Sequence, residues 1–129
     1  MPTIILSVAA GGAIGATLRW AIVRWAGHAL GLAFPYGTLI VNVLGSLVMG
    51  VAAVAMMERF PGSWSRFSPF LMTGILGGFT TFSAFSLDAL FLIERGRNLA
   101  AVSYIGGSVA LSIAGLWAGL ALARGVWGP

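Results

Sequence analysis

The chain has 129 residues, of which 59% are hydrophobic and only 8% are charged. Soluble domains carry about 25% charged residues, so this composition excludes a water-soluble monomer. The chain has no cysteine and a single histidine, His28, which excludes disulfides and thiolate chemistry and argues against a transition-metal centre. The pI of about 11.3 comes from scattered arginines without a basic run, so nucleic acid is not an expected partner.

Four apolar stretches follow one another along the chain. A helix needs roughly 20 apolar residues to cross the hydrocarbon core of a bilayer. We therefore predict an all-α integral membrane protein in which residues 1–129 form a single four-helix transmembrane domain. The first stretch has no basic n-region, so we expect it to be retained as a span. The spans are expected at about Thr3–Trp25, Gly37–Met57, Pro69–Ile93 and Leu99–Ala123, with His28 in a connecting loop and without a role.

The first stretch combines small residues with an arginine near its end. Gly11 and Gly15 have the GxxxG spacing that allows close helix contact, either within the chain or between two copies. Arg19 either places positive charge at a pore entrance, where it attracts anions, or reaches toward the lipid headgroups.

The second and fourth stretches each carry one polar stripe at a spacing of four residues, which places its members on one helix face. Such groups either hydrogen-bond between helices or line a polar pathway. The two matched stripes and a mid-membrane asparagine favour the pathway. The stripes consist of Thr38, Asn42 and Ser46 in the second stretch and of Tyr104, Ser108 and Ser112 in the fourth.

The third stretch has a poor helix centre, because three glycines precede two β-branched threonines between Gly74 and Thr81. We predict that the helix breaks near Gly77–Thr80, close to mid-membrane. Freed carbonyls at that depth can hold a cation such as Na⁺. The alternative is that the glycines line a packing contact. Phe82 and Phe85 follow on one side of the resuming helix, where ring edges could meet a small anion or the rings could simply contact lipid.

The arginines do not specify an orientation for the chain. Three arginines flank the spans on each side, apart from Arg19 inside the first span. This balance is explained either by insertion in both orientations with antiparallel pairing, or by orientation signals outside the arginine count. Asp88, near the end of the third stretch, is expected to form a salt bridge with Arg19 or with an arginine of a nearby loop.

Three segments resemble the signature blocks of the Fluc (CrcB) fluoride channels. They are Gly11–Trp20, Gly37–Ser46 and Gly74–Phe85, and the resemblance covers essentially the whole chain. It implies an antiparallel, dual-topology homodimer in a bacterial inner membrane, with two fluoride pores and a central structural Na⁺. This chain departs from the pattern at Ala84, where many members of the family have a second hydroxyl residue.

The resemblance also implies roles for individual residues. Na⁺ would be bound by the backbone carbonyls of Gly77 and Thr80, and Arg19 would stand at the pore entrance. The residues expected to line the fluoride path are Asn42, Phe82, Ser83, Phe85, Tyr104, Ser108 and Ser112, to which the polar stripe of the second stretch adds Thr38.

The expected function is passive export of F⁻ that lowers the fluoride concentration in the cytoplasm. An enzyme is not expected, because no nucleophile–base set or metal cluster is present. Two alternatives stay open. A small dual-topology multidrug exporter would need a membrane-embedded carboxylate, for which Asp88 is the only candidate. A structural subunit would transport nothing.

Overall fold

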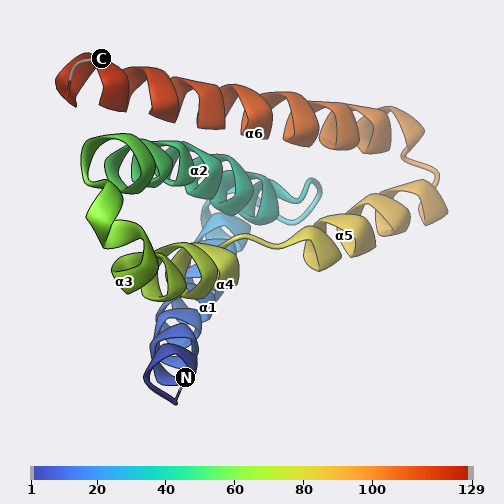
Figure 1. Ribbon diagram of the computed structural model, residues 1–129. Coiled ribbons are helices and arrows are strands. Elements are labelled where there is room, and N and C mark those ends of the chain that lie inside the picture. Colours follow the sequence, from blue (N-terminus) through green and yellow to red (C-terminus); the bar gives the residue numbers. More distant parts are fainter. Residues whose placement is uncertain (1, 128–129) are drawn as a thin grey trace.

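The computed structural model describes residues 2–127 and is helical in every regular element (Figure 1). Four helical stretches are long and apolar enough to cross a membrane, as predicted, so the chain is a multi-pass membrane protein. These spans are Pro2–Leu30, Tyr36–Arg59, Trp64–Glu94 and Asn98–Trp127. Their elements are α1 (Pro2–Leu30), α2 (Tyr36–Ala53), η1 (Val54–Arg59), α3 (Trp64–Ser68), η3 (Pro69–Leu76), α4 (Gly77–Phe79), α5 (Phe82–Glu94) and α6 (Asn98–Trp127), with a 3-10 turn, η2 (Pro61–Ser63), before α3.

Helix α1 is longer than the first predicted span. It continues to Leu30, so the expectation that His28 lies in a loop was wrong; His28 lies in the last helical turn. The helix stops before Gly31, whose φ of 87° is readily adopted only by a residue without a Cβ. The connection to α2 is therefore confined to residues 31–35.

The third span begins earlier than predicted and changes its helical type at Pro69. Helix α3 already starts at Trp64, and the backbone widens into the π-helix η3 at Pro69. Proline has no N–H group and its ring clashes with the carbonyl four residues earlier, so a regular α-helix cannot continue unchanged through it.

The spans pack in two pairs. Helix α2 lies along α6, and both run in the same direction, while α1 crosses η3 and α4 (Figure 1). Small residues allow this close approach. A Cβ added at Gly74 would lie 2.9 Å from the Cα of Gly11, and one added at Gly50 would lie 2.9 Å from the backbone nitrogen of Leu120. The Gly11–Gly15 motif thus serves packing within the chain.

Two extended residues separate α4 from α5. Thr80 has φ −89° and ψ 156°, and Thr81 has φ −152° and ψ 120°. Gly77 and Gly78 remain helical, so the threonines, whose branched side chains suit extended backbone, carry the interruption. Beyond it, α5 leaves the α3–α4 segment and packs mainly against α6 (Figure 1). These two helices share a buried core that includes Ala89, Leu92 and the fully buried Tyr104.

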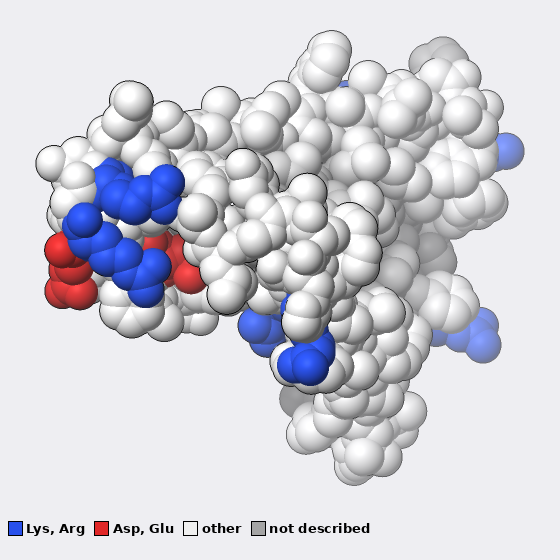
Figure 2. Space-filling model, turned by 180° about the vertical axis from the view of Figure 1, so that it is seen from behind, with Lys and Arg blue, Asp and Glu red and all other residues white. Residues whose placement is uncertain are grey.

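The surface suits a lipid environment. Many large apolar side chains are exposed, among them Trp20, Leu99 and Trp117. Figure 2 shows the face behind that of Figure 1, where broad uncharged areas separate a few groups of charged side chains and the acidic ones gather at one end. Among the described residues one ion pair is found, between Arg124 and Glu58 at 2.8 Å.

Candidate functional site

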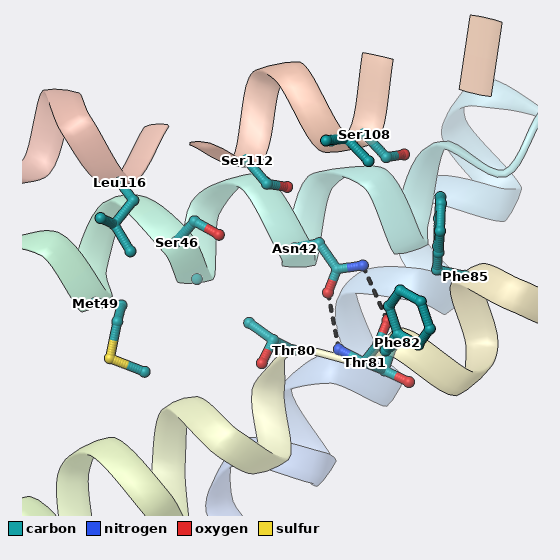
Figure 3. A pocket seen from close by; sticks show the side chains of 12 residues that line it. Asn42, Ser46, Met49, Thr80, Thr81, Phe82, Phe85, Ser108, Ser112 and Leu116 are labelled. Atoms are coloured by element: carbon teal, nitrogen blue, oxygen red, sulfur yellow. Dashed lines mark hydrogen bonds between the residues drawn. The ribbon is translucent and has the colours of Figure 1, made fainter. Parts of the chain in front are cut away.

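A cavity of about 310 Å³ lies between α2, α6 and the Thr80–Thr81 interruption (Figure 3). Its lining combines amide, hydroxyl and aromatic groups with aliphatic side chains, and none of the lining residues is charged. The residues are Asn42, Gly45, Ser46, Met49, Thr80, Thr81, Phe82, Phe85, Ser108, Val109, Ser112 and Leu116. The cavity can therefore offer hydrogen-bond donors to a small solute without presenting a fixed charge.

Asn42 joins α2 to the interrupted third span through two hydrogen bonds (Figure 3). Its Nδ2 donates to the Thr81 carbonyl at 3.0 Å, and its Oδ1 accepts from the Thr81 backbone N–H at 2.8 Å. The side chain thus replaces the helical partners that extended backbone loses. An asparagine amide carries two N–H donors, so one donor remains after these bonds are made.

Thr81 also starts the next helix. Its hydroxyl accepts from the backbone N–H of Ala84 at 3.2 Å, which makes Thr81 the N-cap of α5. The same hydroxyl lies 3.3 Å from that of Ser83. Ser83, expected on the fluoride path, is exposed and is not among the residues that line this cavity in the single chain.

Phe82 and Phe85 both border the cavity (Figure 3). Their ring centroids are 5.5 Å apart, and the Phe85 ring packs 5.2 Å from that of Tyr104. The two rings differ in their burial, since Phe82 is 78% exposed whereas Phe85 is partly buried against the core between α5 and α6.

Serine residues border the cavity from the α6 side. Ser108 and Ser112 lie one turn apart on α6 and both line the cavity, as does Ser46 on α2 (Figure 3). The Ser108 hydroxyl is buried and has no hydrogen-bond partner within the described part of the chain. A buried polar group without a partner is costly, so this oxygen has unused hydrogen-bonding capacity next to the cavity.

The remaining members of the two polar stripes lie outside the cavity. Tyr104 is fully buried, and its hydroxyl donates to Oδ2 of Asp88 at 3.2 Å. Thr38 is also buried and interacts with the same tyrosine. The expected salt bridge between Asp88 and an arginine was therefore wrong; a phenol from the adjacent helix is the partner that the packing of α5 on α6 provides.

Arg19 and Gly77 also lie outside the cavity. The Nε of Arg19 donates to the Gly78 carbonyl at 3.0 Å, across the contact between α1 and α4. Gly77 is exposed at the start of α4, whereas Thr80 borders the cavity.

Thr81 is the residue of this site that sequence reasoning missed. Its backbone is held by Asn42 and its hydroxyl caps α5. The available signal was a threonine immediately before an apolar helical run, which is a common N-cap position. The signal was weak because Ala84 stands where a capping box has Glu or Gln.

The sequence matches the family of CrcB-like proteins, described as Camphor Resistance (CrcB), over residues 6–120. A protein of Cereibacter sphaeroides is 54% identical over 121 residues, which cover 94% of either chain. One of Rhizobium etli is 53% identical over 119 residues, covering 92% of this chain and 94% of its own. One of Rhodopseudomonas palustris is 55% identical over 121 residues, covering 94% and 97%. All three bear the name fluoride-specific ion channel FluC, which describes an ion channel and not an enzyme. With a match that spans most of its length, the chain belongs to the CrcB-like family.

Proposed function

We propose that this protein is a fluoride-selective channel that passively exports F⁻ from the cytoplasm of a bacterium. The observation that carries the proposal is the uncharged cavity beside the interrupted third span, together with the buried Ser108 hydroxyl at its edge, which lacks a partner. The names of the relatives support fluoride as the ion.

The chemistry of the lining suits a small, strongly hydrated anion. Such an ion leaves water only where other donors replace its hydration shell. The lining offers several groups that can replace these water molecules. They are the Ser108 and Ser112 hydroxyls, the remaining N–H of Asn42 and the positive edges of the Phe82 and Phe85 rings. A fixed cation in the lining would hold the anion too firmly for rapid release, and the lining has none.

The functional unit we propose is an antiparallel homodimer with two pores, in the inner membrane. Phe82 borders the cavity yet is 78% exposed, which suits a site that a second copy completes. The even distribution of arginines supports insertion in both orientations.

The backbone at the interruption suits a central structural Na⁺. In a continuous helix the Gly77 carbonyl would accept from Thr81 N–H and the Thr80 carbonyl from Ala84 N–H. Both donors are diverted, the first to Asn42 and the second to the Thr81 hydroxyl. Two carbonyls released in this way are hard oxygen ligands, and a cation held by them would neutralise their partial negative charge at the dimer centre.

Passive conduction is sufficient for export. Hydrogen fluoride crosses membranes as a neutral acid and dissociates in a less acidic cytoplasm. A negative interior then drives the anion outward with about 2.3 kcal/mol per charge per 100 mV.

The test is fluoride efflux from proteoliposomes, recorded with a fluoride electrode, with chloride efflux as the control. We expect rapid loss of fluoride and retention of chloride. Proton-coupled dye movement without fluoride loss would indicate the multidrug exporter, and no movement of either would indicate a structural subunit.

A separate experiment tests the dual topology. Because the chain has no cysteine, Gly62→Cys introduces a unique label at a site where an added side chain meets no neighbour. With a membrane-impermeant maleimide, about half of the copies should react before permeabilisation if both orientations are populated equally. Complete labelling, or none, would contradict the antiparallel dimer and leave the fluoride measurement unaffected.

A further inference from the structure

Arg19 contacts the backbone of the third span rather than the cavity. Its Nε donates to the Gly78 carbonyl at 3.0 Å, and the side chain is half-buried. Arg19 is not among the residues that line the cavity, and within the described residues it forms no ion pair. The guanidinium is therefore placed by a carbonyl at the end of α4.

That carbonyl belongs to the last turn of a helix that stops. Helix α4 ends at Phe79, and the amide that Gly78 would bind in a continuous helix, that of Phe82, lies beyond two extended residues. The last carbonyls of a helix lack internal partners and carry partial negative charge. A positively charged donor is a favourable partner for such a carbonyl, and Arg19 supplies one.

The close approach of α1 to α4 brings the arginine within reach. A Cβ added at Gly78 would lie 2.8 Å from the Gly12 carbonyl and 3.2 Å from the Ala16 nitrogen. Only small residues allow this contact, and Arg19 follows Ala16 by three residues on the same face of α1.

We propose that Arg19 is a positioning residue that caps the carbonyl end of the interrupted helix. By engaging the Gly78 carbonyl, it leaves the neighbouring Gly77 and Thr80 carbonyls as the pair available to a cation. The inference rests on the proposed function, because the cation that these carbonyls would bind is part of that function. It assigns the arginine to the geometry of the interruption instead of to the attraction of anions at a pore entrance.

Two substitutions separate the cap from the charge. Arg19→Gln removes the charge, but the amide nitrogen of glutamine is as many bonds from Cα as the Nε of arginine, so it can donate to the same carbonyl. Arg19→Met has a similar length and neither charge nor donor. If Arg19 is a cap, fluoride efflux of Arg19→Gln stays within about twofold of the wild type, because a neutral donor still satisfies the carbonyl. That of Arg19→Met falls about tenfold, as expected when the carbonyl loses its hydrogen bond altogether.

The Na⁺ dependence of efflux distinguishes positioning from a general loss of stability. Arg19→Met should need more Na⁺ for half-maximal efflux, because a released Gly78 carbonyl disturbs the pair at Gly77 and Thr80, and Arg19→Gln should not. Equal losses in both variants would show that the charge acts at the entrance and would overturn the proposal, as would wild-type behaviour of both.

Two further measurements keep the proposal testable if Arg19→Met does not assemble or if the wild type conducts no fluoride. If Arg19→Met does not assemble, the fluoride concentration for half-maximal efflux of Arg19→Gln decides: an unchanged value supports the cap, and a raised value overturns it. If the wild type conducts no fluoride, the proposed function fails independently. The cap then still predicts faster exchange across residues 77–82 in Arg19→Met than in Arg19→Gln, and equal exchange overturns it.

Discussion

Asn42 joins two parts of the chain that would otherwise be linked only by packing. Its amide both accepts from and donates to the backbone of Thr81, at 2.8 and 3.0 Å. The substitution Asn42→Ala removes both bonds at once and leaves an N–H and a C=O of the extended segment without these partners. We expect the interruption between α4 and α5 to lose its attachment to α2.

The size of the effect follows from the burial of Thr81. Each buried backbone group that loses its partner costs about 1–3 kcal/mol. Thr81 is only partly buried and borders the cavity, so water can satisfy its backbone in part. The lower limit applies, and two groups give about 2 kcal/mol of lost stability for Asn42→Ala. Asn42→Asp should also be less stable, because a carboxylate cannot donate to the Thr81 carbonyl, and its charge should block anion conduction.

The measurement is reversible unfolding of the detergent-solubilised protein by sodium dodecyl sulfate, followed by the fluorescence of its five tryptophans. Ser46→Ala is the matched control, because Ser46 lies one turn further along α2 and lines the same cavity. Its expected change is below about 0.5 kcal/mol. Equal unfolding free energies for Asn42→Ala and Ser46→Ala would refute the reasoning.

Two further predictions concern packing and the α5–α6 contact. Gly15→Ala should destabilise the chain by about 1–3 kcal/mol in the same unfolding assay, because the added methyl meets the Ile75 carbonyl, whereas Gly106→Ala, where nothing lies within 4 Å, should be neutral or slightly stabilising. Tyr104→Phe removes the 3.2 Å hydrogen bond to Asp88. Relative to the wild type, amide exchange should become faster in α5 and stay unchanged in α1. The same change in both helices, or none in α5, would show that the bond does not hold α5.

The four spans could be predicted from the sequence because span length and hydropathy are local properties. The predicted starts at Gly37 and Leu99 and the predicted end at Ile93 differ from the observed ones by a single residue. The end of the first span and the start of the third could not be predicted in this way. The residues between Trp25 and Leu30 read as a connection after an arginine and a tryptophan, yet they continue α1 until Gly31 ends it. Likewise Pro69 looked like the start of a span and is instead the first residue of the π-helix η3, which directly continues α3.

The candidate site could be predicted only where residues share a helix face. Asn42 and Ser46 on α2 line the same cavity as Ser108 and Ser112 on α6, and within each helix the spacing of four residues placed the pair on one face. The partners of Asn42, Asp88 and Arg19 depend on which helices cross and at what height, and no spacing within one helix determines that. The sequence therefore identified polar groups and could not identify the backbone carbonyls that two of them bind.

The most direct test of the account compares fluoride efflux from proteoliposomes of Phe85→Ile, of Phe82→Ile and of a matched control. Phe91→Ile is the control, because Phe91 lies on the same helix and is not among the residues that line the cavity. If fluoride passes through the cavity, each of the two cavity variants loses efflux by about tenfold, equivalent to about 1.4 kcal/mol, while dimer assembly is kept and Phe91→Ile conducts normally. Unchanged fluoride efflux in assembled Phe82→Ile and Phe85→Ile would contradict the account.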